Sequence, residues 1–406
     1  MLELLAPAGS LVKLKKAILF GADAVYVGGE EFSLRTAAEN FTNDELREGI
    51  EFAHERGKKV YAAVNIAPRN NETERLAEYA KFLEVAGCDG VIVADLGAFS
   101  VIKRSAPHLH IHVSTQANVT NFESALMWRE LGATRIVLAR ELSLAEIKEI
   151  REKLPDDCEI EAFVHGAMCV SYSGRCLLSN YLANRDSNRG ECAQPCRWKY
   201  YLMEEKRPGE YLPVFENDKG TFIFNSKDLC MIRHIAELDK SGVHSLKIEG
   251  RVKSDFYVAT VVKAYRQAID DYYAGKEFDE KLLSEVCKVS HREYSEGFYF
   301  GRPEQIYTYS SYVRQCELVG IVRDYDKESG IATIEQRNRF FAGDTVEFMP
   351  PVGDYKEFKI KSMTDEAGED IKSAPHPQMI VKIPVDFELE KDTYMRKACN
   401  LNGDNK

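Results

Sequence analysis

The run KVYAAVN at residues 59–65, followed by GVIVAD at residues 90–95, decides the fold of this chain. Both runs are almost entirely apolar, which is typical of strands buried on both faces of a parallel sheet. The amphipathic stretch TNDELREGIEFAHERG, residues 42–57, precedes the first run and predicts a helix. Asn43 is expected to cap this helix and Gly57 to end it. Strand and helix therefore alternate, as they do in α/β proteins.

Six further runs of this kind lie in the first 250 residues. They are LELLA (2–6), AVYVG (24–28), HIHVSTQ (110–116), RIVLAR (135–140), EIEAFVH (159–165) and HSLKIEG (244–250). Eight βα units predict a TIM-like (β/α)8 barrel. An open doubly wound sheet is the competing fold, but it would need a phosphate loop such as GxGxxG or the P-loop motif, and neither occurs.

The chain is predicted to divide into three parts. They are a barrel (1–275), a connecting segment (276–309) and a C-terminal domain (310–400). Residues 317–351 alternate apolar and polar residues in short runs broken by Gly, Asp and Asn, which predicts a small antiparallel β-barrel. Within it, residues 337–341 place cations beside aromatics. This arrangement suits nucleotide stacking, or packing with Phe340 and Phe341 on opposite faces.

Composition narrows the class of protein. A chain of 406 residues with 44% hydrophobic content can bury a large core in two or more domains. The amino terminus lacks the order of a signal peptide, and no apolar run approaches the roughly 18 residues of a membrane span, so we expect no membrane contact and a cytoplasmic location. The net charge of −11 argues against binding nucleic acid over the whole surface. Arginines and Lys199 nevertheless outnumber acidic residues between residues 175 and 199, which forms either a basic patch or a solvated face.

Half of the ten cysteines gather around one segment, between the seventh and eighth predicted strands. They are Cys169, Cys176, Cys192, Cys196 and Cys230. Residues 166–227 form an enlarged βα loop, far longer than the usual connection of about 2 to 6 residues. In a cytoplasmic chain, clustered cysteines favour thiolate ligation of iron or zinc over disulfides. The C-x6-C-x15-C-x3-C spacing suits either a zinc site or an iron–sulfur cluster.

Polar residues stand at the carboxyl ends of several predicted strands, the rim where barrel enzymes carry their active sites. They are Asn65, Gln116, Arg140, His165, Glu249 and Arg251. Either they form a functional site, or they are polar only because the ends of the strands are exposed to solvent. If they form a site, the guanidinium forks of Arg140, Arg175 and Arg251 suit carboxylates. Glu249 or His165 could then move a proton.

Three blocks of the sequence are similar to a known family. The run EAFVHGAMCVSYSGRCLLS, residues 161–179, resembles the signature of peptidase family U32, the collagenase-like group. NRGECAQPCRWKY (188–200) and SLKIEGRVKS (245–254) resemble its companion blocks, and the resemblance covers essentially the whole chain. The overall length, the QPCRWKY block and the tail after residue 310 most resemble the transfer RNA branch of the family.

This resemblance implies an enzyme that modifies transfer RNA. The implied reaction is an oxygen-independent, prephenate-dependent hydroxylation of the wobble uridine to 5-hydroxyuridine. The implied cofactor is a four-iron, four-sulfur (4Fe-4S) cluster on Cys169, Cys176, Cys192 and Cys230, with Cys196 as the alternative fourth ligand. We expect His165, Glu249 and Arg140 to act in catalysis, and Arg175, Arg251, Asn65 and Gln116 to bind tRNA or prephenate.

The resemblance also leaves two other functions open. The family title implies a collagenase-like peptidase, although neither an HExxH helix nor a GxSxG elbow occurs in the sequence. A thiol–imidazole pair of Cys169 and His165 would be the remaining nucleophile. Another branch of the family works as a pair of related chains, so association with a second family member is the third option.

Overall fold

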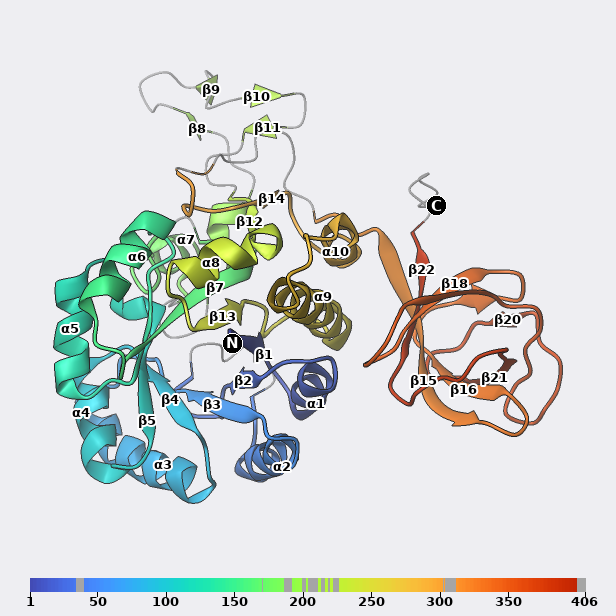
Figure 1. Ribbon diagram of the computed structural model, residues 1–406, viewed down its shortest axis with the longest axis horizontal. Coiled ribbons are helices and arrows are strands. Elements are labelled where there is room, and N and C mark those ends of the chain that lie inside the picture. The colour runs from blue at the N-terminus through green and yellow to red at the C-terminus, as the bar shows by residue number, and fades with distance from the viewer. Residues whose placement is uncertain are drawn as a thin grey trace.

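Eight parallel strands close into a barrel surrounded by helices, and a separate β-domain follows it (Figure 1). The computed structural model describes residues 1–33, 40–169, 171–185, 192–198, 202–203, 211–212, 216–217, 220–221, 226–301, 303 and 312–399. The barrel strands are β1 (Glu3–Pro7), β2 (Ala24–Val27), β3 (Lys59–Ala63), β4 (Gly90–Val93), β5 (His110–Val113), β6 (Arg135–Val137), β7 (Glu159–Ala167) and β13 (Ser245–Ile248). Each pairs in parallel with the next, and β13 closes the barrel by pairing with both β7 and β1. The predicted barrel is confirmed.

Helices follow the barrel strands and cover the outside of the barrel (Figure 1). They are α1 (Leu11–Leu19), α2 (Asn43–His54), α3 (Thr73–Val85), α4 (Leu96–Ser105), α5 (Phe122–Leu131), α6 (Leu144–Lys153), α8 (Ile235–Lys240) and α9 (Asp255–Tyr273). A further helix, α10 (Glu280–Val286), lies in the connecting segment. Within the part of the chain that is described, no helix combines the length and the apolar character needed to cross a membrane.

The cap of α2 differs from the prediction by one residue. Thr42, not Asn43, is the cap, and its hydroxyl accepts a hydrogen bond from the Glu45 backbone N–H at 3.2 Å. The Glu45 carboxylate accepts in return from the Thr42 backbone N–H at 2.9 Å. This reciprocal capping box requires a glutamate three residues after the cap, which selects Thr42 over its neighbour. The helix ends at His54, and Gly57, with a φ of +66°, makes the turn into β3.

The long connection between β7 and β13 contains its own short elements. Its described parts include α7 (Leu178–Ala183), a 3-10 turn at Pro195–Arg197, and β12 (Asp228–Cys230). Strand β12 runs antiparallel to β7 and is followed in the sheet by β14 (Tyr294–Ser295). The end of the insertion therefore extends the barrel sheet.

The C-terminal domain is an antiparallel half-barrel, as the alternating pattern predicted. Its main sheet has the order β19 (Lys356–Lys359), β18 (Thr345–Met349), β22 (Tyr394–Ala398), β15 (Cys316–Asp326), β16 (Ile331–Gln336), β21 (Ile380–Pro384). A two-stranded sheet of β17 (Phe340–Phe341) and β20 (Ser373–Ala374) adds to it. Phe340 is buried in the core of this domain, whereas Phe341 is exposed beneath the guanidinium of Arg339. The two phenylalanines thus point to opposite faces.

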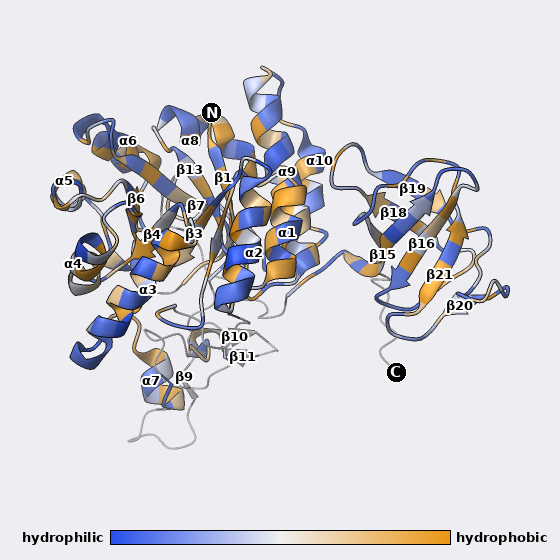
Figure 2. Ribbon diagram, turned by 90° about the horizontal axis from the view of Figure 1, so that it is seen from below, coloured by the Kyte–Doolittle hydropathy of each residue, from blue (hydrophilic) through white to orange (hydrophobic). Residues whose placement is uncertain are grey.

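The half-barrel packs beside α1, α9 and α10 (Figure 2). Tyr394 of β22 lies in the same apolar cluster as Phe20 and Phe256, and its hydroxyl donates to Asp255 at 2.7 Å. Lys16 of α1 donates to the Asp392 carboxylate at 2.7 Å. Apolar burial and paired charges therefore join the two domains.

Candidate active site at the carboxyl rim of the barrel

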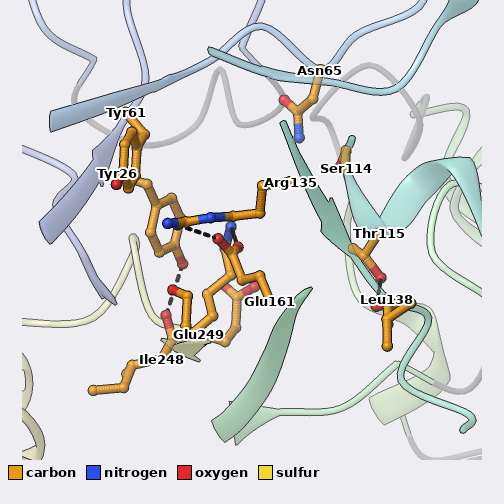
Figure 3. A network of polar contacts seen from close by, with 12 residues as sticks. Tyr26, Tyr61, Asn65, Ser114, Thr115, Arg135, Leu138, Glu161, Ile248 and Glu249 are labelled. Carbon is orange, nitrogen blue, oxygen red and sulfur yellow. Dashed lines mark hydrogen bonds and ion pairs between the residues drawn. The ribbon is translucent and has the colours of Figure 1, made fainter. Parts of the chain in front are cut away.

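A layer of paired charges fills the interior of the barrel below the rim (Figure 3). Glu161 of β7 is completely buried and accepts from Lys247 Nζ at 2.6 Å and from Arg135 Nη1 at 3.1 Å. Arg135 also donates to Glu3 at 2.6 Å. Because each buried charge has an opposite partner, the cost of removing it from water is offset. The layer is a polar floor for the site.

None of these floor residues was among the predicted site residues. The signal that could have identified them is the start of the seventh strand, EIEAF, in which Glu159 and Glu161 alternate with apolar residues. A strand buried on both faces would normally be apolar throughout. A charge at the inward position therefore indicates a partner inside the barrel.

Arg140 and Glu249 meet at the rim above this floor. Arg140 Nη2 lies 3.3 Å from Glu249 Oε2, and Arg140 Nη1 donates to the Ala167 carbonyl at 2.8 Å. The guanidinium also stacks on the Phe163 ring, 3.8 Å from its centroid. Arg140 Nε is buried and has no hydrogen-bond partner in the described part of the chain. An unpaired buried donor is costly, so an acceptor from a substrate would be stabilised there.

Asn65 and Gln116 form a second pair at the same rim. The Asn65 side-chain amide donates to Gln116 Oε1 at 2.6 Å, and the Ser114 hydroxyl lies 3.3 Å from the same oxygen. Nearby strand ends are also linked, since Tyr26 donates to the Ile248 carbonyl at 3.0 Å (Figure 3). The structure therefore brings Asn65 and Gln116 together, as the strand-end rule predicted.

Arg251 is held beneath the surface rather than presented to solvent. Its side chain is buried, and Nη1 donates to the Ser33 hydroxyl at 2.8 Å. A Cβ atom on Gly28 would lie 2.2 Å from the same Nη1, so only glycine leaves room for the guanidinium. This geometry suits a residue that supports the loop after β2.

His165 does not share the surroundings of Arg140 and Glu249. Its ring packs against Tyr257, Tyr265 and Tyr294, and the Tyr294 hydroxyl lies 3.3 Å from Nε2. Burial lowers the pKa of His165 to about 3, so the imidazole is neutral at physiological pH.

A bulge in β7 explains this orientation. Phe163 lies opposite Lys247 but His165 lies opposite Ile248, so β7 carries one extra residue between them. An extra residue reverses the alternation of side chains. The sequence pattern would have placed His165 on the same face as Glu161 and Phe163, whereas the bulge turns it toward α9.

The cysteine-rich segment approaches the rim from outside the barrel. Gly174, with a φ of +73°, lies against the β5 end, since a Cβ atom there would be 3.2 Å from Gln116 Cβ. Arg175 follows it and is exposed. The segment that carries Arg175 thus lies beside the Asn65–Gln116 pair.

The cysteine side chains do not form a common metal site as they are placed. Within the described residues, which include all ten cysteines, no group of three or more His, Cys, Asp or Glu side chains could hold a metal ion. Cys169 and Cys192 are exposed, whereas Cys230 is buried with its sulfur 3.9 Å from the Tyr265 hydroxyl. Burial raises the pKa of Cys230 to about 12. This arrangement does not fit a 4Fe-4S cluster, and binding one would require these side chains to move together.

Comparison with known proteins places the chain in a family. Residues 9–308 match the family described as peptidase family U32, and residues 314–396 match the family's C-terminal domain. The chain belongs to peptidase family U32. One U32 relative, tRNA hydroxylation protein P1 of Bacillus subtilis strain 168, is 42% identical over 98% of this chain and 94% of its own. The tRNA hydroxylation protein P of Escherichia coli K12 is 40% identical over 99% of this chain and 97% of its own.

A relative named for a different RNA substrate matches less of the chain. The 23S rRNA 5-hydroxycytidine C2501 synthase of Escherichia coli K12 is 38% identical over 66% of this chain and 39% of its own. The family resemblance inferred from residues 161–179 is therefore confirmed.

Proposed function

We propose that this chain hydroxylates transfer RNA at carbon five of the wobble uridine, giving 5-hydroxyuridine. The observation that carries the proposal is the similarity, over nearly the full length, to two proteins named for tRNA hydroxylation. A third relative, named for a hydroxycytidine in ribosomal RNA, supports RNA hydroxylation as the broader activity. A tRNA substrate would place the protein in the cytoplasm.

The Arg140–Glu249 pair at the rim suits this chemistry. With water as the oxygen source, replacing the hydrogen on carbon five with a hydroxyl group releases two electrons and two protons. The reaction therefore needs an external two-electron acceptor, and the ring proton must pass to a base. Glu249 is a candidate base, and Arg140, at 3.3 Å from it, can stabilise negative charge beside it. Asn65 and Gln116 offer amide groups that suit the polar edge of a base or sugar. His165 is assigned no proton transfer because its neutral ring lies among tyrosines.

We further propose prephenate as the co-substrate of an oxygen-independent reaction. Its carboxylates suit guanidinium groups, which bind such groups through two parallel hydrogen bonds. Arg140, with its unpartnered Nε, and the exposed Arg175 are the candidates. Arg251 is buried against Ser33 and would support the site from beneath.

The peptidase alternative receives no support from the geometry. His165 Nδ1 is buried with no hydrogen-bond partner among the described residues, and Nε2 faces Tyr294. The imidazole therefore does not activate the Cys169 thiol, which is the pairing that a thiol peptidase would need.

Replacing Arg140 with alanine is expected to lower 5-hydroxyuridine in tRNA by about tenfold or more, since a charge-assisted contact contributes about 1.5 to 3 kcal/mol. The measurement is mass spectrometry of tRNA from a deletion strain carrying the variant, grown without oxygen so that any oxygen-dependent route is silent. Arg129→Ala is the control, because Arg129 pairs with Asp157 on the exposed surface. Unchanged 5-hydroxyuridine in the deletion strain itself would refute the proposed function.

We also propose that these cysteine side chains move together to bind a 4Fe-4S cluster, which predicts iron and sulfide in protein purified without oxygen. Alanine at Cys169, Cys176 or Cys192 is expected to abolish both, because each would supply one ligand. Cys230→Ala and Cys196→Ala, made separately, should differ, and only the true fourth ligand should cost iron. Cys316→Ala, in the first strand of the half-barrel, is the control. A colourless, iron-free protein that still hydroxylates tRNA would rule the cluster out.

A further inference from the structure

Large aromatic side chains are exposed on the cysteine-rich segment. Tyr172 is 47% exposed, Tyr181 is 81% exposed and Trp198 is 43% exposed. Solvent-exposed rings of this size, gathered on one short segment, are typical of a binding surface. We name the described residues 171–185 and 192–198 the cysteine-rich unit.

The two halves of this unit are held together. Ser179 of α7 is buried, and its hydroxyl accepts from the Ala193 backbone N–H at 3.0 Å. This bond joins the helix that carries Tyr181 to the stretch that ends at Trp198. The aromatic residues therefore belong to one packed unit rather than to two independent loops.

The unit stands at the mouth of the barrel. It begins just after β7 ends at Ala167, and Gly174 lies against Gln116 at the rim. Figure 2 shows α7 projecting beyond one end of the barrel. The unit therefore lies beside the Asn65–Gln116 pair at the rim.

The charge of the unit is opposite to that of the whole chain. Residues 171–185 contain Arg175 and Arg185, both exposed, and no Asp or Glu. Residues 192–198 add Arg197 and again no carboxylate. The whole chain has a net charge of −11, whereas the charged side chains of these two stretches are all arginines.

Aromatic rings and arginines together match the chemistry of unpaired nucleotides. Bases stack on aromatic side chains only where their faces are free, and arginine binds the phosphates between them. A duplex hides its base faces and would meet only the charges. The combination therefore favours a single-stranded RNA loop over a duplex.

We propose that Tyr172, Tyr181 and Trp198, with Arg185, hold the unpaired bases and phosphates of an RNA loop over the barrel mouth. This inference rests on the proposed function and specifies how the substrate is recognised. The target base would be presented to Arg140 and Glu249, while its neighbours in the loop stack on the unit.

Binding of a fluorescent RNA stem-loop, measured by anisotropy with the full chain, tests the proposal. Tyr181→Ala and Trp198→Ala are each expected to weaken binding about tenfold. Tyr181→Phe keeps the ring and should bind as the wild type does. Arg185→Ala should reduce the slope of log affinity against log salt by about 0.7. A blunt RNA duplex of matching length should bind more weakly than the stem-loop.

Matched controls lie elsewhere on the surface. Phe341→Ala removes an exposed ring from the half-barrel, and Arg104→Ala removes an exposed cation at the end of α4, at the opposite rim. Neither should change affinity, and an unaltered melting temperature would confirm that all variants are folded. Equal binding of stem-loop and duplex, or wild-type affinity in Tyr181→Ala and Trp198→Ala, would overturn the proposal.

The two proposals can fail separately. If 5-hydroxyuridine does not depend on the gene, but Tyr181→Ala still weakens stem-loop binding, the proposed function fails and the RNA surface stands. If 5-hydroxyuridine depends on the gene while the aromatic variants bind and modify fully, the surface inference alone fails.

Discussion

Replacing Glu161 with alanine is expected to lower the free energy of unfolding by about 3 to 5 kcal/mol, because it leaves buried cations without their partner. Glu161 is completely buried, and the side chains of Lys247 and Arg135 that it binds are only 5% and 3% exposed. Arg135 would keep Glu3, but Lys247 would lose its ion-pair partner at 2.6 Å. An uncompensated charge in the barrel interior cannot be resolvated without opening the sheet.

Glu159 on the same strand is the matched control for this prediction. It also pairs with Arg135, but its side chain is 45% exposed, so Glu159→Ala should cost at most about 1 kcal/mol. Urea unfolding followed by circular dichroism compares the two variants at neutral pH. Equal losses of stability for both would contradict the role of Glu161 as the central anion of the floor.

Replacing Arg396 with alanine should also cost about 3 to 5 kcal/mol, and it should loosen the half-barrel from the barrel. Arg396 is fully buried and donates to Glu285 of α10 at 2.5 Å and to Glu347 of β18 at 2.6 Å. Burial alone would raise the pKa of Glu347, but Arg396 outweighs it and holds this pKa below its ordinary value. Glu347 is therefore charged at neutral pH. Removing Arg396 leaves Lys288 as its remaining described ion-pair partner.

Lys397→Ala is the control, because it removes a neighbouring charge that pairs within the half-barrel. Lys397 lies 3.5 Å from Asp344, and both side chains are partly exposed, so Lys397→Ala should change stability by less than about 1 kcal/mol. Differential scanning calorimetry should show a lower transition, or two separate transitions, only for Arg396→Ala. A single unshifted transition in that variant would show that the apolar contacts around Tyr394 suffice to join the domains.

Most of the fold could be predicted because its signals are local. Each barrel strand is a short apolar run, and each amphipathic stretch between two runs has a helical period, so the order of elements follows from neighbouring residues. The capping of α2 was misplaced by one residue, since Thr42 and Asn43 are both good caps and only the contact with Glu45 decides between them.

The site was predicted less completely, because the direction of a side chain depends on strand register and on bulges in the sheet. The strand-end rule placed Asn65, Gln116, Arg140 and Glu249 at one rim, because parallel strands end there. In the structure Asn65 contacts Gln116, and Arg140 contacts Glu249. The same rule misjudged the surroundings of His165, since a single extra residue in β7 reverses its direction. No strand was predicted at Cys230, which lies in β12, paired with the strand that carries His165.

The amino-acid sequence by itself determined the barrel, the half-barrel, the family and the position of the cysteine-rich segment at the carboxyl rim of the barrel. Periodicity and motif spacing are properties of residues close together in the sequence, so they can be recognised without knowing how the chain packs. Only the tertiary structure decided which charges meet inside the barrel, which side chains meet at its mouth and which aromatic rings remain exposed. These outcomes depend on strand register and on contacts between residues far apart in the chain, such as Glu161 with Lys247 and Glu285 with Arg396.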